Sequence, residues 1–194
     1  KTEFKRKKDQ KEFGGSIESY YKTLNMTVCL DKASEVVTPR IAQLSQKTNQ
    51  FNLTTKRYTE SDIEGFIKSK NSDVIFVELE DRFGKMGVVG VAIIKYSKDC
   101  ASIDTFLLSC RVIGRGLERV LLNACIQLAK NRNLSIIRGS YLMTNKNGQV
   151  IDFYTKNNFI LDDENENEIK FSFETINKIS STPSYFKEIN IKYL

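Results

Sequence analysis

The chain has 194 residues, which is enough for one globular domain with a sizeable core and an extension. Its composition is ordinary for a globular protein, and no apolar run approaches the roughly 20 residues that a membrane-spanning helix needs. The net charge of +6 comes without a nucleic-acid motif or interleaved aromatic residues. We therefore expect neither a nucleic acid nor a membrane as a partner.

Histidine is absent, which removes Ser–His and Cys–His nucleophile pairs and histidine metal sites together. The four cysteines are far apart and form no C-x-x-C pair, so we expect no zinc site and no disulfide framework. This cysteine usage is typical of a reducing cytoplasm. The chain does not begin with Met, which suggests a piece of a longer protein.

Residues 1–50 are predicted to form a mostly helical extension or linker, followed by one domain over 51–194. A helix is expected over 10–24, with a break at its two glycines, and a short strand over 26–30. Thr38 and Pro39 predict the start of the next helix, because Thr can cap it and Pro is tolerated at its first position.

The remaining elements alternate between strand and helix patterns. Residues 51–59 alternate like a strand, and Thr59 with Asp62 resembles a capping pair that opens a helix to about Lys70. Further strands are expected over 73–84, 86–97, 100–110, 134–144, 159–163 and 168–174. A long helix is expected from 117 and a short one over 148–158, with a hairpin turn at Lys85–Met86.

This order predicts an α/β fold with a mixed, mostly antiparallel twisted sheet and helices on both faces. The strand before the long helix and the strand after it should run parallel, because a crossover helix joins them.

The stretch CRVIGRG, residues 110–116, joins a strand to the long helix. Free N–H groups at a helix start and the absence of a side chain at Gly114 and Gly116 would let the backbone from Val112 onward approach a phosphate or pyrophosphate. Arg111 and Arg115 would add positive charge. The alternative is a tight turn that binds nothing. The spacing matches neither the lysine-containing phosphate loop nor the three-glycine dinucleotide fingerprint.

A second motif, NGQVIDFYTKNNF, follows about thirty residues later and contains Asn147, Tyr154 and Phe159. Together the two motifs resemble those of the Gcn5-related N-acetyltransferase (GNAT) superfamily, over roughly residues 51–174. Val150 and Asn158 replace the alanine and glycine of the usual second motif. The resemblance implies transfer of an acyl group from acetyl-CoA or another acyl-CoA to an amine, alcohol or thiol acceptor.

The resemblance also implies roles for individual residues. Tyr154 would protonate the departing thiolate, and the turn from Arg111 through Ile113 to Gly116 would bind the pyrophosphate. The backbone of Leu108, Ser109 and Cys110 would bind the pantetheine amides like an added strand. Asn147 would bind the cofactor, cap its helix, or do both. For Tyr154 and the strand end, the alternatives are ordinary core packing and ordinary sheet pairing.

Asp104 is a carboxylate inside an apolar strand, where alternation places it on one face with Phe106 and Leu108. It is a candidate general base for the acceptor, directly or through water, and the alternative is a structural carboxylate. Glu78 and Glu80 are weaker candidates. Cys110 is a less favoured nucleophile candidate.

A narrower resemblance comes from RIAQLSQKTNQFNLTTKRYTESDI, whose polar cluster (Lys47, Asn49, Gln50 and Asn52) would line the acceptor side or pack against the domain. Joined to IDTFLLSCRVIGRG, this segment resembles the C-terminal part of FkbH-like proteins, in which a haloacid-dehalogenase (HAD)-type domain precedes an acetyltransferase-like domain. That resemblance implies a covalently linked HAD-type domain and an acyl carrier protein as acceptor. The alternative function is a non-catalytic module that binds a carrier protein's phosphopantetheine while the HAD-type domain transfers a glyceryl group.

Overall fold

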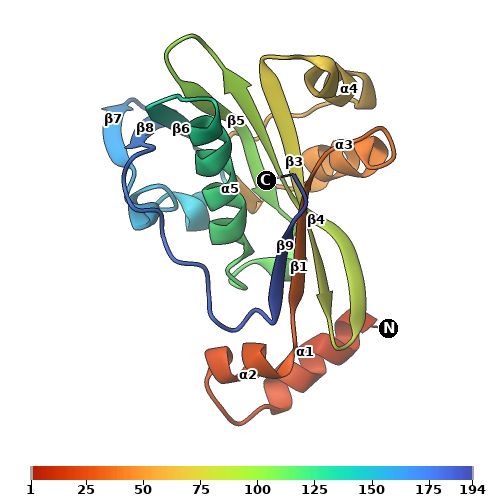
Figure 1. The fold of residues 1–194 in the computed structure, drawn as a ribbon. Helices are drawn as coiled ribbons and strands as arrows, with labels where there is room; N and C mark the ends of the chain where they lie inside the picture. The colour runs from red at the N-terminus through yellow and green to blue at the C-terminus, as the bar shows by residue number, and fades with distance from the viewer. Residues whose placement is uncertain (1, 194) are drawn as a thin grey trace.

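The computed structural model describes residues 2–193, whose strands and helices form one central sheet with helices around it (Figure 1). The strands are β1 (Thr27–Lys32), β2 (Phe51–Asn52), β3 (Ser72–Asp81), β4 (Gly84–Tyr96), β5 (Ala101–Leu108), β6 (Ile136–Leu142), β7 (Ile160–Glu164), β8 (Glu168–Glu174) and β9 (Glu188–Ile191). The α-helices are α1 (Thr2–Glu12), α2 (Ile17–Thr23), α3 (Thr38–Lys47), α4 (Glu60–Lys68) and α5 (Leu117–Asn131). Three short 3₁₀ turns are η1 (Cys110–Val112), η2 (Gly148–Val150) and η3 (Thr155–Asn157).

The sheet has the order β7-β8-β6-β5-β4-β3-β1-β9, and β2 pairs with β5 outside this path. Helix α5 covers one face, while α3 and α4 cover the other (Figure 1). Most neighbouring strands are antiparallel, and β5 and β6 are parallel over only three residue pairs, 101–103 with 137–139. The mixed, mostly antiparallel sheet and the parallel contact across the long helix are therefore confirmed.

Local sequence signals explain several element boundaries. Thr59 and Asp62 form a complete capping box at the start of α4, as predicted. Pro39 lies in the first turn of α3, but the N-cap of that helix is Val37, so the capping role predicted for Thr38 is wrong. The Thr38 hydroxyl instead donates a hydrogen bond to the Ser34 carbonyl over 3.1 Å.

Three predicted elements differ from the structure. The strand expected over 51–59 is limited to the two residues of β2, because Thr55 has φ +52° and turns the chain away from β5. The helix expected over 148–158 is two 3₁₀ turns, η2 and η3. The hairpin between β3 and β4 turns at Arg82–Phe83 rather than at Lys85–Met86, which belong to β4.

The N-terminal segment is attached to the sheet by a buried ion pair. The Arg6 guanidinium donates two hydrogen bonds of 2.8 Å to the Asp81 carboxylate, and Arg6 is only 4% exposed. These first 50 residues are mostly helical, as expected, and β1 within them pairs with β3 and β9. The division of the chain at residue 50 stays a prediction.

The C-terminal segment after β8 crosses α5 and adds β9, a strand that the sequence patterns did not predict. β9 runs parallel to β1 at the edge of the sheet. Along the way Arg119 and Asn123 of α5 donate hydrogen bonds to the carbonyls of Ser181 and Ser180. This segment therefore covers part of α5, including its first turn.

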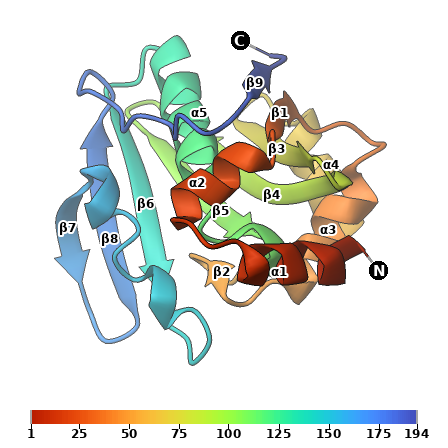
Figure 2. The same ribbon diagram turned by 90° about the horizontal axis from the view of Figure 1, so that it is seen from below.

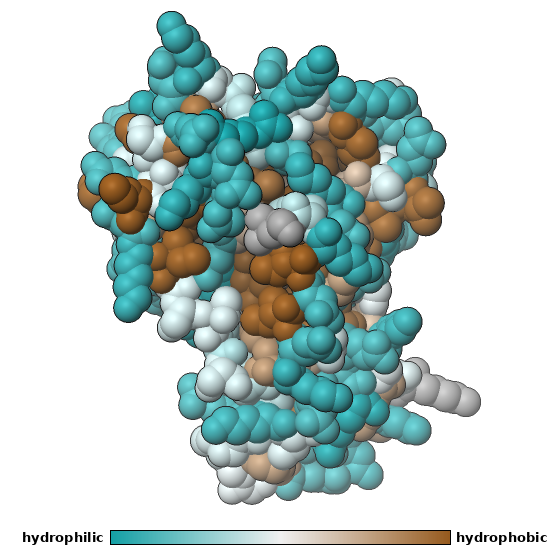
Figure 3. Space-filling model, viewed as in Figure 1, coloured by the Kyte–Doolittle hydropathy of each residue, from teal (hydrophilic) through white to brown (hydrophobic). Residues whose placement is uncertain are grey.

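The surface is largely hydrophilic on the face shown in Figure 3, with hydrophobic side chains gathered near its middle. Within residues 2–193, no helix combines the length and the apolar character needed to cross a bilayer.

Candidate active site

The edges of β5 and β6 separate beyond their three parallel pairs, and β2 fills the space between them. The two residues of β2 pair antiparallel with Leu107–Leu108 of β5. The Leu53 N–H then donates to the Phe106 carbonyl over 3.0 Å, and the Leu53 carbonyl accepts from the Leu142 N–H of β6 over 2.7 Å. Figure 2 shows β2 on the β6 side of β5. We call this space, between residues 104–108 and 140–142, the strand gap.

The Asn147 side chain links β2 to the end of β6. Its Nδ2 donates 2.9 Å hydrogen bonds to the carbonyls of Asn52 and Leu142, and its Oδ1 accepts from Tyr141 and Thr144. Asn147 is fully buried, and its side chain does not cap η2. The helix cap expected for this side chain is therefore wrong. Both of its donors are used inside the protein, which disfavours a cofactor contact, and that contact stays a prediction.

The end of β5 is paired on both sides. Leu108 pairs with Gly90 of β4 and with Phe51 of β2, and the Ser109 N–H donates to the Val89 carbonyl over 2.7 Å. The free backbone edge expected at residues 108–110 is therefore occupied by β2 at Leu108. The family resemblance implied a free strand end here, and nothing in the sequence indicated the segment that fills it.

The glycine turn has one open side. Gly114 and Gly116 both have φ +78°, a left-handed conformation that favours glycine, and a Cβ at Gly114 would meet no atom within 4 Å. The N–H groups of Val112 and Arg115 donate to carbonyls within the turn. In the described part of the chain, the N–H groups of Ile113 and Gly114 have no such acceptor. The backbone can therefore receive an anion at residues 113–114.

The other end of the turn is closed. A Cβ at Gly116 would lie 2.4 Å from Pro183 Cγ and 2.9 Å from the Tyr185 hydroxyl oxygen. Arg115 is 6% exposed and its guanidinium lies 3.4 Å from the Asp81 carboxylate, so its charge belongs to the ion pair with Arg6. This ion pair disfavours a phosphate contact of the Arg115 side chain, and the binding role of Arg115 stays a prediction.

Arg111 lies beside the turn without a carboxylate partner among residues 2–193. Its guanidinium donates hydrogen bonds of 3.3 Å to the Ser109 hydroxyl and to the Met86 carbonyl. Its guanidinium therefore lies against β4, and its positive charge is not neutralised by a carboxylate in the described chain.

A cavity of about 430 Å³ lies between the start of α5 and the η2–η3 region. We call it the α5 cavity, and it is lined by Phe51, Ile113, Gly114, Glu118, Arg119, Gln149, Val150, Asp152, Phe153, Lys156 and Asn157. Phe51 of β2 forms part of its wall and packs against Phe106 and Phe153, with ring centroids 6.1 and 5.4 Å away. Phe51 therefore stands between this cavity and the strand gap.

Glu118 in the α5 cavity was not identified from the sequence, although it follows the second glycine of the turn by two residues. Its Oε2 is buried without a hydrogen-bond partner in the described chain, and burial raises the pKa of its carboxyl. While Glu118 is ionised, its negative charge disfavours the binding of an anion in the α5 cavity.

Tyr154 is fully buried in the core beneath β6. Its ring lies 5.0 to 5.3 Å from the rings of Phe153, Phe159 and Phe171, and a Cβ on Gly139 would lie 2.2 Å from Tyr154 Cζ. Gly139 forms the last parallel pair before the strand gap begins. The Tyr154 hydroxyl has no partner within residues 2–193, and burial raises the pKa of this phenol well above its ordinary value.

Asp104 lies elsewhere than expected. Asp104 is the extra residue of a bulge in β5, because the consecutive residues Ile93 and Ile94 of β4 pair with Thr105 and Ile103. The bulge interrupts the alternation of β5, so the Asp104 carboxylate contacts groups on the α4 side of the sheet instead of sharing the face of Phe106 and Leu108. It accepts hydrogen bonds from Lys56 (2.7 Å) and Tyr58 (2.6 Å) and lies 2.8 Å from the Lys95 ammonium.

Burial opposes ionisation of Asp104, but the hydrogen bonds from Lys56, Lys95 and Tyr58 outweigh it and hold the pKa of Asp104 below its ordinary value. Two of these partners follow β2, so Asp104 fastens this segment to β5. The base role of Asp104 stays a prediction, and a lowered pKa disfavours it.

A second cavity, of about 660 Å³, lies on the other side of residues 50–51. We call it the basic cavity, and it is lined by Arg40, Leu44, Lys47, Thr48, Asn49, Gln50, Ser109, Cys110, Asn145 and Lys146. It contains the exposed Cys110 thiol and three of the four polar residues that the sequence marked for the acceptor side. The fourth, Asn52, is fully buried and its Nδ2 donates to the Thr48 carbonyl.

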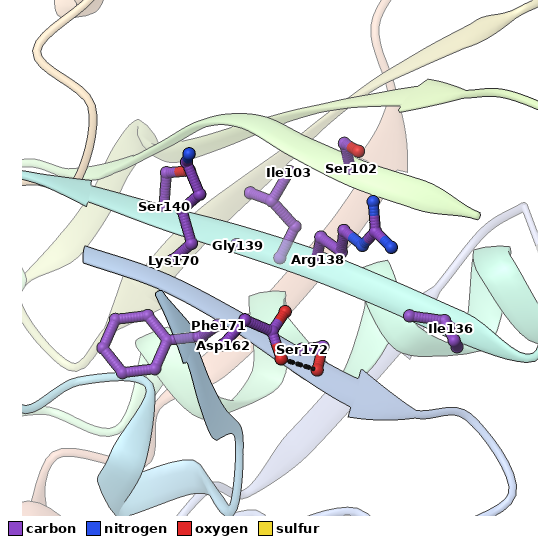
Figure 4. A pocket seen from close by; sticks show the side chains of 10 residues that line it. All are labelled: Ser102, Ile103, Ile136, Arg138, Gly139, Ser140, Asp162, Lys170, Phe171 and Ser172. Atoms are coloured by element: carbon purple, nitrogen blue, oxygen red, sulfur yellow. Dashed lines mark hydrogen bonds between the residues drawn. The ribbon is translucent and has the colours of Figure 1, made fainter. Parts of the chain in front are cut away.

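A third cavity, of about 500 Å³, lies between β5, β6, β7 and β8 (Figure 4). Among the side chains in this view, Asp162 accepts a 2.6 Å hydrogen bond from the Ser172 hydroxyl. None of the predicted site residues lines this cavity.

The sequence matches a model of a protein family, described as Acetyltransferase (GNAT) family, over residues 38–159. Curated protein sequences give no significant match. Many solved structures resemble the fold, among them a domain from Methanocaldococcus jannaschii, with TM-score 0.61, 13% identity, and coverage of 77% of this chain and 99% of that chain.

Two further similar structures are N-acetyltransferases. One is the ribosomal-protein-S18-alanine N-acetyltransferase from Escherichia coli, with TM-score 0.59, 13% identity, and coverage of 76% of this chain and 94% of that chain. The other is a spermidine N-acetyltransferase from Vibrio cholerae, with TM-score 0.57, 13% identity and the same coverage. These likenesses confirm the predicted fold.

Proposed function

This chain is an acyltransferase of the acetyltransferase (GNAT) family, and we propose that it binds an acyl-CoA with its phosphates at the glycine turn and its arm in the strand gap. The observation that carries the proposal is that Ile113 and Gly114, whose N–H groups donate to no carbonyl in the described chain, both line the α5 cavity. A bound acyl-CoA would supply an activated acyl carbonyl and a thiolate leaving group for direct attack by an amine, alcohol or thiol.

The residues fit the two ends of this ligand unequally. The open side of Gly114 suits the pyrophosphate. The arm fits only when β2 leaves the strand gap, because β2 holds the backbone groups of Leu107–Leu108 that an added strand would use. Residues 51–53 therefore act as an internal gate that keeps water out of the gap in the free protein.

Tyr154 is placed to assist the leaving group. Its hydroxyl is buried without a partner beside Gly139, where the strand gap begins. A phenol with a raised pKa keeps its proton, so Tyr154 would stabilise the developing thiolate mainly by donating a hydrogen bond. Complete proton transfer is less favoured, because a thiol has an ordinary pKa of about 8.5.

The acceptor would approach from the basic cavity, on the opposite side of residues 50–51 from the α5 cavity. Since the hydrogen bonds from Lys56, Lys95 and Tyr58 lower the pKa of Asp104 and make it a weak base, the acceptor proton would pass to water rather than to a dedicated base. Positioning then supplies much of the rate.

The proposal is tested by titrating the protein with acetyl-CoA in a calorimeter, with free phosphopantetheine titrated in parallel. Micromolar binding that needs the nucleotide half supports the pyrophosphate position at the glycine turn. Equal binding of both ligands, or no binding of acetyl-CoA, would overturn it.

A finer proposal concerns the protein context. The segment Lys47–Thr54, which carries the resemblance to FkbH-like proteins, separates the two cavities. A carrier protein's phosphopantetheine arm would then occupy the strand gap, with a linked HAD-type domain carrying out glyceryl transfer. The net charge of +6 favours an acidic carrier protein as partner. Binding of a holo-carrier protein, with no binding of the apo form, is the result this alternative predicts; equal binding of both forms would contradict it.

A further inference from the structure

We propose that the basic cavity binds the anionic group, a phosphate or carboxylate, of a small acceptor. This inference deepens the proposed function. It rests on that function only in identifying the bound molecule as the acceptor of the acyl group. It is carried by four cationic side chains that have no carboxylate partner in the described chain: three line the basic cavity, and a fourth, Arg111, lies near Arg40.

Three of these cations line the basic cavity and come from separate segments: Arg40 and Lys47 from α3, and Lys146 from the loop after β6. None of the residues that line the cavity is acidic. Across residues 2–193, no carboxylate lies within 4.0 Å of any of the three. By contrast, Lys56 and Lys95 form ion pairs with the Asp104 carboxylate at 2.7 and 2.8 Å. Lysines that stabilise the fold are thus paired with a carboxylate, whereas the cations of the basic cavity are not.

A fourth cation, Arg111, adds to the charge near Arg40. Their guanidinium groups donate to carbonyls two residues apart on β4, at Val88 for Arg40 and at Met86 for Arg111. Burial and the nearby Arg111 charge both lower the pKa of Arg40. Like charges held this close are unfavourable without an anion between or beside them, and guanidinium groups bind carboxylate and phosphate through paired hydrogen bonds.

The position of the cavity explains why an acceptor would need such a group. Gln50 lines the basic cavity and Phe51, the next residue, lines the α5 cavity. An anion held by Arg40 and Lys47 would therefore fix the rest of the molecule beside the gate, on the side opposite the glycine turn. The volume of about 660 Å³ is sufficient for a small metabolite.

Cys110 provides a direct readout, because its exposed thiol lines the basic cavity. We would compare its rates of alkylation by anionic iodoacetate and neutral iodoacetamide, with Cys100 as the internal reference, using mass spectrometry of each peptide. The ratio of the two rates cancels differences in thiol reactivity. The account predicts a ratio at Cys110 at least about fivefold above that at Cys100, since a cationic site concentrates anions.

The matched variants are Lys47→Glu/Lys146→Glu and, as a control, Lys70→Glu/Lys178→Glu, which changes the same number of exposed lysines elsewhere. Only the first should reduce the Cys110 ratio to that of Cys100. Equal ratios at the two cysteines in the wild type, or the same reduction in both variants, would overturn the proposal.

Probe molecules then identify the anion. Phosphoethanolamine, β-alanine and ethanolamine present a phosphate, a carboxylate and no anion beside the same amine, and free phosphopantetheine represents the arm of a carrier protein. Slower alkylation of Cys110 by neutral iodoacetamide with either of the first two, but not with ethanolamine, supports a small anionic acceptor. Protection by phosphopantetheine alone, or by none of the four, contradicts it.

Calorimetry with acetyl-CoA separates this proposal from the proposed function. Cys110 protection without acetyl-CoA binding would leave the anion site standing and remove the acyl-CoA function. Normal acetyl-CoA binding without Cys110 protection would leave the acyl-CoA function standing and remove the anion site.

Discussion

The Asn147 side chain donates a 2.9 Å hydrogen bond to the main-chain carbonyl of Asn52, across 95 positions of the sequence. This bond joins the second motif of the GNAT resemblance to the segment that carries the FkbH-like resemblance, and it holds β2 in the strand gap. The asparagine that suggested a cofactor contact is thus part of the device that keeps the gap closed in the free protein.

Weakening the contacts of β2 should increase the affinity for acetyl-CoA. Phe51→Leu removes ring contacts with Phe106 and Phe153 and should cost about 1 to 2 kcal/mol of stability. If β2 must leave before the ligand enters, a loss of about 1.4 kcal/mol in β2 docking raises the apparent affinity about tenfold. Calorimetry and thermal unfolding measure the two effects. Phe76→Leu, in the core on the α3 and α4 face, is the control, and an equal affinity gain there would contradict the gate.

Substitution at the glycine turn should abolish ligand binding. Gly114→Asp places a negative side chain where the phosphate would lie and strains a backbone with φ +78°. We expect at least about a tenfold loss of acetyl-CoA affinity, corresponding to about 1.4 kcal/mol. Gly87→Asp is the matched control, because Gly87 has φ +66° and an equally open Cβ position. Similar binding losses in both variants would show that strain alone is responsible.

Tyr154→Phe should separate catalysis from stability. The hydroxyl has no partner in the described structure, so its removal should leave the melting temperature unchanged or slightly raised. Loss of a hydrogen bond to the developing thiolate should reduce kcat about 10- to 100-fold while KM changes little. A steady-state assay with acetyl-CoA measures both constants. Unchanged kcat would remove Tyr154 from the chemistry.

Asp104 should contribute stability that depends on pH. Its pKa is lowered in the folded protein, so its stabilising effect is complete above the unfolded pKa of about 3.9 and disappears as the pH falls through the lower folded value. Asp104→Asn should therefore cost about 2 kcal/mol at pH 7, and the difference from wild type should shrink below about pH 4. Denaturant titrations at pH 7, 5 and 3 measure this difference. Asp99→Asn, in the exposed β4–β5 turn, should show neither effect.

The same variant decides between the two roles of Asp104. A fastening residue predicts a kcat within a fewfold of wild type at neutral pH, with the pH profile of kcat unchanged in shape. A general base predicts a large loss of kcat and the disappearance of the acidic limb of the profile.

Some local signals predicted the structure correctly, although the Thr38 cap and the Lys85–Met86 turn were wrong. The long-range contacts that fill the strand gap and close the glycine turn were not predicted. The capping box of Thr59 and Asp62 and the glycine turn depend on neighbouring residues, and both are present in the structure. The position of β2 depends on Asn147, and the closing of Gly116 depends on Pro183, almost seventy residues away. Neither contact leaves a periodic pattern that a single sequence can show.

The sequence indicated which residues belong to the candidate site better than it indicated where their side chains lie. Alternation placed Asp104 on the wrong face, because a single bulge in the β4–β5 pairing shifts every later side chain. The sequence predicts an Arg115 charge beside the phosphate, but Asp81, from the end of a different strand, pairs with it. Charged side chains near a turn can be assigned only when the partners from distant elements are known.

The central claim, that the arm of an acyl-CoA replaces β2 in the strand gap, is tested most directly by amide hydrogen exchange. The Leu53 N–H donates to the Phe106 carbonyl in the free protein and should be protected there. With acetyl-CoA at saturation, confirmed by calorimetry on the same sample, we predict faster exchange at Leu53. Unchanged or slower exchange at Leu53 in the bound state would show that β2 stays in place, and would contradict this account.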